Sequence, residues 1–374
     1  MARRLPGVAF SRYPRQYVAH RGTPPVIDGD VDKAAWRRAP WSEPFVEIRG
    51  PADAPEGSGP SRAQATRMKM LWDDEFLYVA AVMEVAEGDE LVAKFTQRNS
   101  PIFHTDSDFE VFIDPAGCCH GYKELELNAL NTVWNLMLTK PYMDGGGEKS
   151  GRVAKEGEPS FWEVRGQRSA TRVLRGAMHD ASAPARWCCE VALAHKDTLP
   201  GAPVSGRQPA VGGCWRINFS RVEKGGSVNW VWSPQVVWWP AAKRYLGQVN
   251  MHLPDAWGVV VFADAEGCLA DGEAAEAWRD PCWPARHAAA CLYYAARAFK
   301  EAHEGRQPRS LEELEGAGLL AGAELAGSVL SLSSEASGYT AEATAGGWTA
   351  LINHERLLRV RPAGDAVASR GDGW

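Results

Sequence analysis

The chain has 374 residues, of which 45% are hydrophobic and 24% charged, so a large core can form and more than one domain is expected. Its formal net charge of −6 gives no electrostatic reason to expect a nucleic acid or an anionic membrane as a partner. No run approaches the roughly 18 consecutive apolar residues that a membrane-spanning helix requires.

Residues 1–23 form a basic N-terminal segment, and no acidic residue occurs before Asp28. The segment lacks an apolar stretch of the kind found in secretory signals, which favours an intracellular or organellar protein and leaves an organelle-targeting segment open. The eight cysteines include no CxxC motif and no spacing typical of zinc ligands. We therefore expect a soluble protein without a structural zinc.

Short apolar or alternating runs, bounded by Gly, Pro, Asn and Asp, recur over residues 24–265. This spacing predicts a mainly β domain, an antiparallel β-sandwich of the immunoglobulin-like or jelly-roll type. Asp73 and Asp74 are expected to form the turn of a hairpin above Trp72 and Tyr78. The predicted strands are 68–74, 76–84, 109–115, 122–130, 133–139, 186–194, 214–222, 229–234 and 257–264.

The stretch DSDFEVFIDP (106–115) places acidic residues at alternating positions. Successive side chains of a strand point to opposite faces. Phe109, Val111 and Ile113 should therefore face the core, and Glu110 should face outward, with Asp106 and Asp108 shaping a turn at the rim. The next runs repeat the pattern, and the predicted polar face also holds Glu124, Glu126, Asn128, Arg216, Asn218 and Ser220. Such a face is either a solvated surface or the floor of a binding site.

The sequence changes character after about residue 275, and we expect a small α+β extension over 276–363 followed by a flexible tail over 364–374. Apolar residues fall on one stripe of a helix over 284–303, which Gly305 ends. Ser310 and Glu313 predict a capping box that opens a second, short helix. Three strands should follow, at 338–344, 347–353 and 357–362. The stripe comprises Ala288, Cys291, Leu292, Ala295, Ala298, Phe299 and Ala302.

Seven motifs occur in a fixed order along residues 24–263: VIDGDVDKAAWRRA, MLWDDEFLYVAA, DFEVFIDP, YKELELNALNTVWNLMLTKPY, WRINFSRV, NWVWSP and NMHLPDAWGVVVF. Together they resemble the family 9 carbohydrate-binding modules, and the chain is most similar to the family 9-like branch, many members of which carry a C-terminal extension. The resemblance implies a β-sandwich that binds the end of a saccharide in a slot. In the xylanase-associated members, two tryptophans clamp the sugar ring, while acid, amide and Arg side chains bind its hydroxyls.

Several family positions differ in this chain. Glu110 matches the sugar-binding Glu of the family, but the first clamping tryptophan falls on Phe103 or His104 and the second falls near Met251. Glu126 stands where the family has Arg. The resemblance also leaves a calcium ion open, although no spaced acidic loop requires one. The predicted ligand-binding residues are Glu110, Glu126, Asn128, Trp134, Phe103, His104, Tyr142, Arg221, Met251 and His252, with no catalytic and no metal-binding residue assigned.

The first hypothesis is therefore non-catalytic binding of a mono- or oligosaccharide. A second is an enzyme on the same sandwich, in which His104, His252, Glu110 and Glu126 converge at one rim for acid–base chemistry. A third is a scaffold that has lost sugar binding, which exposed leucines on the short helix near 310–320 would favour. Trp238 and Trp239 either plug the fold or provide the stacking face that Met251 cannot.

Overall fold

The computed structural model describes residue 10 and residues 12–23, 25–325 and 327–364. The chain divides into two compact units. The sandwich unit comprises Pro14–Val237 and Leu246–Trp278, and the C-terminal unit comprises Trp238–Tyr245 and the chain from Arg279, with the described part of Arg3–Tyr13. Residues 365–374, most of the predicted flexible tail, lie outside the described residues. None of the described helices has the length and apolar character needed to cross a membrane.

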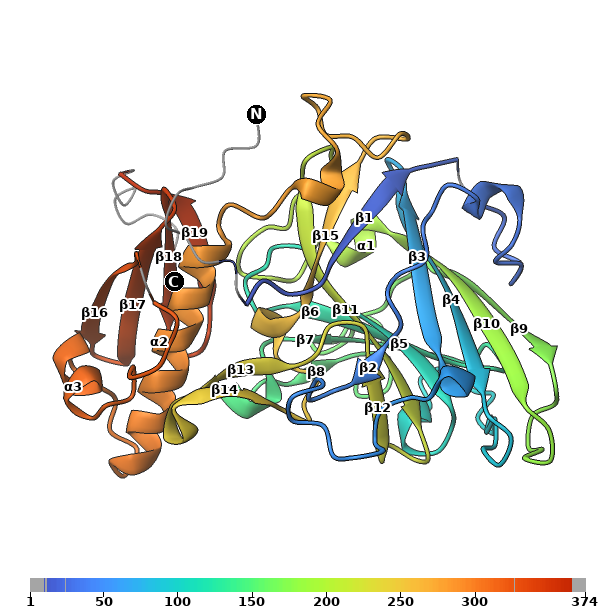
Figure 1. Ribbon diagram of the computed structural model, residues 1–374, viewed down its shortest axis with the longest axis horizontal. Helices are drawn as coiled ribbons and strands as arrows, with labels where there is room; N and C mark the ends of the chain where they lie inside the picture. Colours follow the sequence, from blue (N-terminus) through green and yellow to red (C-terminus); the bar gives the residue numbers. More distant parts are fainter. Residues whose placement is uncertain (1–9, 11, 24, 326, 365–374) are drawn as a thin grey trace. The chain divides into compact units, whose positions relative to one another are not determined.

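The sandwich unit is built on one 13-stranded sheet, ordered β8-β7-β6-β5-β11-β15-β1-β3-β4-β10-β9, with β12 between β11 and β2 (Figure 1). Its neighbouring strands are antiparallel except at β1, which runs parallel to both β15 and β3. The strands are β1 Gln16–Arg21, β2 Val46–Glu47, β3 Thr66–Trp72, β4 Phe76–Val85, β5 Asp108–Asp114, β6 Tyr122–Asn128, β7 Val133–Leu138, β8 Glu148–Lys149, β9 Arg168–Arg175, β10 Ala185–Ala194, β11 Cys214–Glu223, β12 Val228–Val231 and β15 Gly258–Ala263.

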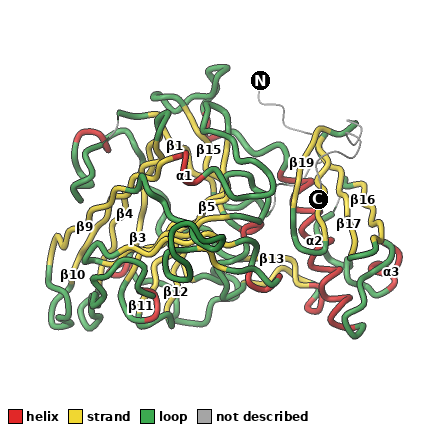
Figure 2. The backbone as a smooth tube through the Cα atoms, turned by 180° about the vertical axis from the view of Figure 1, so that it is seen from behind, coloured by secondary structure: helices red, strands yellow, loops and turns green. Residues whose placement is uncertain are grey.

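The two halves of this curled sheet enclose the main core. Phe109, Val111 and Ile113 of β5 lie fully buried in it, together with side chains of β3, β4, β6, β10 and β11. The alternation in the sequence therefore predicted the core face of β5 correctly. Strands outnumber helices along the chain (Figure 2). The predicted mainly β sandwich with a smaller C-terminal α+β part is confirmed.

Short helices interrupt the loops that join the strands. They are α1 His195–Thr198 and the 3₁₀ turns η1 Ala34–Trp36, η2 Arg62–Gln64, η3 Ile102–His104, η4 Tyr142–Asp144, η5 Pro240–Ala242, η6 Pro254–Ala256 and η7 Ala275–Ala277. A separate two-stranded sheet consists of β13 Val236–Trp239 and β14 Arg244–Gly247.

The C-terminal unit pairs a long helix with a four-stranded antiparallel sheet. Helix α2 (Trp283–Ala302) packs against β17 (Gly338–Ala345) and β18 (Trp348–Asn353), and the remaining elements are α3 (Leu311–Gly316), β16 (Val329–Glu335) and β19 (Leu358–Pro362). Most of the predicted stripe of α2 is buried. Ala302 is an exception, because it is exposed in the last turn.

The predicted capping box of α3 is only half correct. Ser310 is the N-cap residue, but its side chain makes no capping hydrogen bond. Glu313 instead accepts the backbone N–H of Arg309 at 2.9 Å and forms an ion pair with Arg306 at 2.9 Å. The Arg306 guanidinium binds the Glu313 carboxylate more strongly than the neutral backbone N–H of Ser310 would in a capping box. Leu314 is fully buried, so the helix does not present this leucine to a partner.

Candidate functional site

The outer face of β5, β6, β7 and β11 carries a row of polar side chains at one level of the sheet. Glu110 lies directly opposite Ser220 on one side and Glu126 on the other, and Glu126 in turn lies opposite Trp134. The alternation of strand residues places these side chains on the face away from the main core. The row therefore combines a hydroxyl, two carboxylates and an indole.

A cavity of about 320 Å³ lies over this row. Glu110, Glu124 and Glu126 form its acidic floor, while the turns η3 and η4 and the segment 249–252 provide its walls. Its other lining residues include Phe103, Phe112, Trp134, Tyr142, Asn250, Met251 and His252. Acidic side chains thus meet aromatic rings in one enclosure.

The walls are held by specific contacts. The Tyr122 hydroxyl lies 3.1 Å from Nδ1 of His252, and the rings of Tyr142 and His252 meet edge to face at 4.6 Å. Met251 is fixed through its carbonyl, which accepts the indole N–H of Trp257 at 2.8 Å. Tyr142 remains 48% exposed, so its ring is accessible from solvent.

The Trp134 ring has two close neighbours. The Phe103 ring stacks on it at 5.8 Å, and the Arg152 guanidinium lies 4.8 Å from its centre. Trp134 is 5% exposed, and its Nε1 has no hydrogen-bond partner. Because buried polar atoms are normally paired, this N–H is a donor that a bound molecule would satisfy.

Burial controls the electrostatics of the floor. Removal from water raises the pKa of Glu110 from 4.5 to about 7. Burial, and then repulsion from neighbouring carboxylates, raises the pKa values of Asp108, Glu124 and Glu126 well above their ordinary range. Burial also lowers the pKa of His252 to about 4, so its imidazole is neutral at physiological pH.

Seven of the ten predicted ligand-binding residues line this cavity. They are Phe103, Glu110, Glu126, Trp134, Tyr142, Met251 and His252. The sequence motifs that carry them lie far apart in the chain, and the sheet register brings them together. Which of them contact a ligand stays a prediction.

Asn128, His104 and Arg221 lie elsewhere. Asn128 is buried at the end of β6, where its amide donates to Asp106 at 2.7 Å and to the Phe95 carbonyl at 2.9 Å. His104 is exposed, and its ring centre lies 3.7 Å from that of the adjacent Phe103 ring in a tilted arrangement.

Arg221 points to the opposite face of β11. Its guanidinium bonds Glu223 at 2.7 Å and the Glu84 carbonyl at 2.7 Å. The alternation that sends Ser220 outward necessarily sends Arg221 inward, and this signal was present in the sequence.

Two acidic residues differ from their predicted roles. Glu124 lines the floor, although the sequence placed it only on the polar face and not among the ligand-binding residues. Asp108 was expected to shape a turn, but it lies within β5 and is fully buried. One oxygen each of Asp108, Glu110 and Glu126 lies within 4.8 Å of the others. Asp106 does fix the loop, because its carboxylate accepts the backbone N–H groups of Lys94 and Phe95.

Trp238 and Trp239 do not line the cavity. Trp238 is buried in the C-terminal unit, where its indole donates to the Leu319 carbonyl at 3.2 Å. Of the two expected roles, the structure therefore supports a packing role for Trp238.

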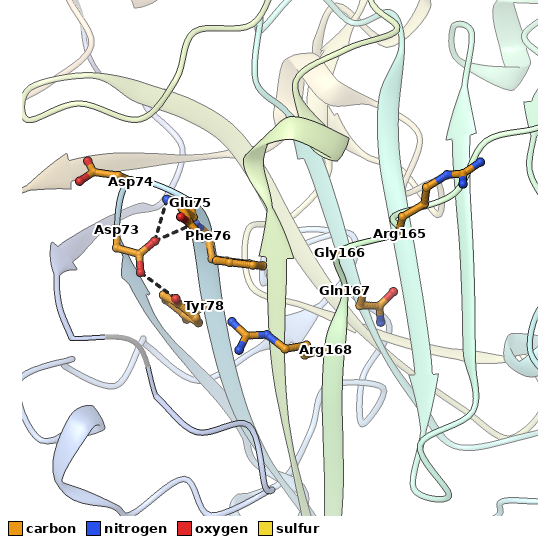
Figure 3. A pocket seen from close by; sticks show the side chains of 9 residues that line it. All are labelled: Asp73, Asp74, Glu75, Phe76, Tyr78, Arg165, Gly166, Gln167 and Arg168. Atoms are coloured by element: carbon orange, nitrogen blue, oxygen red, sulfur yellow. Dashed lines mark hydrogen bonds between the residues drawn. The ribbon is translucent and has the colours of Figure 1, made fainter.

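A second hollow, of about 790 Å³, lies between the turn 73–76 and residues 165–168 (Figure 3). The carboxylate of Asp73 accepts hydrogen bonds from the backbone N–H groups of Glu75 and Phe76 and from the hydroxyl of Tyr78. The Arg168 guanidinium lies 4.5 Å from the Phe76 ring centre. Asp73 is thus occupied by its own hairpin turn, as the sequence predicted for this segment.

No protein-family model and no curated protein sequence matches the chain. Among solved structures, it is similar to a Bacteroides uniformis protein described as a candidate carbohydrate-binding protein, at 12% identity and a TM-score of 0.45, covering 67% of this chain and 99% of that one.

Two further similar structures are family 9 carbohydrate-binding modules from Caldicellulosiruptor kristjanssonii, each with a TM-score of 0.38. The complex with cellotriose is 15% identical and covers 71% of this chain and 98% of that one. The complex with glucose is 16% identical, with coverages of 67% and 96%. The family that the sequence motifs resemble thus appears among the structural neighbours of the chain.

Proposed function

We propose that the sandwich unit binds a saccharide, without cleaving it, in the cavity over β5, β6 and β7. The observation that carries this proposal is the combination of a carboxylate floor, formed by Glu110, Glu124 and Glu126, with aromatic walls in one enclosure of about 320 Å³. Ligand sites of this size are usually lined by apolar rings and a few convergent polar groups.

The chemistry of the lining suits a molecule rich in hydroxyls. Carboxylate oxygens accept hydrogen bonds from hydroxyl groups, and the unpaired Nε1 of Trp134 donates to a hydroxyl oxygen. The exposed ring of Tyr142 offers a surface for the C–H groups of a sugar ring. This assignment gives Tyr142, rather than Trp134, the stacking role, because Phe103 and Arg152 already lie against the Trp134 ring.

Glu110→Ala should abolish measurable saccharide binding. The substitution removes an acceptor at the centre of the floor, and a buried hydrogen bond to a charged group contributes about 1.5–3 kcal/mol. Isothermal titration calorimetry of the full chain against a panel of mono- and oligosaccharides would measure this. Glu87→Ala, at an exposed position outside the cavity, is the matched control and should bind like the wild type. Failure of the wild type to bind any member of the panel would reject the proposal.

Trp134→Phe should weaken saccharide binding about fivefold to tenfold, the equivalent of one neutral hydrogen bond of about 1 kcal/mol. The substitution removes the indole N–H and keeps an aromatic ring. Trp187→Phe is the matched control, because Trp187 also has a buried, unpaired Nε1 but lies in the main core. Calorimetry on both variants distinguishes the two positions. An equal loss of affinity in both would show that Trp134 acts through stability alone.

A further inference from the structure

A cluster of buried carboxylates at and beside the floor, Asp108, Glu110 and Glu126, differs from other buried carboxylates of the sandwich unit. Glu190, for example, is fully buried and accepts hydrogen bonds from Trp36, Gly29 and other donors. Asp106 is also fully buried and accepts three N–H groups. This fold thus provides donors for the carboxylates that it buries, as the cost of burying a charge requires.

Asp108 and Glu126 lack such donors. Asp108 is 0% exposed and Glu126 is 1% exposed. The backbone amide of Val222 stabilises the charged form of Asp108 in part, but neither Asp108 oxygen has a hydrogen bond of ordinary geometry, and Oε2 of Glu126 has none either. Buried polar atoms are normally paired, so oxygens without a donor in the chain indicate a partner from outside it, such as a bound ion.

The arrangement of the oxygens fits a single ion. One oxygen each of Asp108, Glu110 and Glu126 lies within 4.8 Å of the other two. Oxygen ligands lie about 2.3–2.6 Å from a calcium ion, so two of them on opposite sides are separated by about 5 Å. The three oxygens can therefore belong to one coordination sphere.

We propose that Asp108, Glu110 and Glu126 form a binding site for a divalent metal cation of the calcium type. Three carboxylates and no nitrogen or sulfur ligand favour a hard cation over zinc or copper. Glu110 and Glu126 also line the cavity, which offers room for water to complete the coordination. All three residues lie on the paired strands β5 and β6 and not on an acidic loop.

The test is a calcium titration of the chelator-treated full chain at neutral pH, without any saccharide. Its outcome is therefore independent of the proposed saccharide function. We expect one calcium per chain by calorimetry and a higher melting temperature in calcium than in chelator. Asp108→Asn, which leaves the cavity lining unchanged, should weaken calcium binding by more than about tenfold. Glu126→Gln should have a similar effect and provides a second variant if Asp108→Asn folds poorly.

Asp32→Asn is the matched control, because Asp32 is exposed and lies outside the cluster. It should bind calcium like the wild type. The proposal is overturned if calcium, magnesium and manganese all fail to bind the wild type, or if Asp108→Asn and Glu126→Gln both bind calcium unchanged. Stabilisation by glucosamine in the absence of any metal effect would also overturn it, by assigning the positive charge to an ammonium group of the ligand.

Discussion

In the presence of a chelator, we expect the sandwich unit to lose stability as the pH rises from about 4.5 through 7. Glu110 has an ordinary pKa of 4.5, which burial raises to about 7 in the folded protein. The folded state therefore holds more protons than the unfolded state in this window, and stability falls as the pH rises. The displacement corresponds to a loss of the order of 3 kcal/mol from Glu110 over the whole window.

Asp108, Glu124 and Glu126 act in the same direction, because their pKa values are also raised by burial and by mutual repulsion. Urea unfolding at pH 5.5 and at pH 8 would measure the combined effect. Glu110 alone should account for a decrease of about 2 kcal/mol between these two pH values.

Glu110→Gln should flatten this part of the profile, since the amide does not titrate, and Glu87→Gln should leave it unchanged. The expectation would be contradicted by a stability that is constant or increases from pH 5.5 to pH 8. A wild-type slope in Glu110→Gln would instead show that another group of the cluster carries the effect.

The sequence predicted the faces of the central strands well, because alternation is a local property. Phe109, Val111 and Ile113 lie in the core as expected, and so do Leu125 and Leu127. When only one face of a strand is buried, the alternation of its own residues shows which side chains face the core.

Strands without this contrast were missed. In β9 and β16 most side chains are at least partly exposed, so apolar and polar residues do not alternate strictly. β1 was missed for another reason. It pairs in parallel with β15, which lies more than 200 residues later in the chain. The local sequence of β1 contains no information on so distant a partner.

The site was predictable only in part, for the same reason. Alternation indicated that Glu110 and Glu126 face outward, and the register then placed them directly opposite each other. The register depends on long-range pairing, so the sequence did not reveal that Asp108 joins them. Asn128 was placed on the correct face, but it lies at the end of its strand, where its amide donates a hydrogen bond to Asp106 and not to a ligand in the cavity.

Glu190 stabilises the N-terminal part of the sandwich unit through a buried network. Its carboxylate on β10 accepts the indole N–H of Trp36 at 2.5 Å, the backbone N–H of Gly29 at 2.7 Å and the Lys33 ammonium at 2.9 Å. Gly29 adopts a positive φ of 83°, which a glycine tolerates in the bend at Asp28 and Gly29.

Glu190→Ala should therefore destabilise the protein by about 3–5 kcal/mol, because it leaves the partly buried Lys33 ammonium without its buried counter-ion and the Trp36 and Gly29 donors without an acceptor. Urea unfolding at neutral pH would measure the loss. The matched control is Glu84→Ala on the adjacent strand β4, where Glu84 forms partly exposed ion pairs with Arg175 and Arg186. That substitution should cost no more than about 1 kcal/mol. Equal effects of the two substitutions would show that the network around Glu190 does not hold the turn at Gly29 against the sheet.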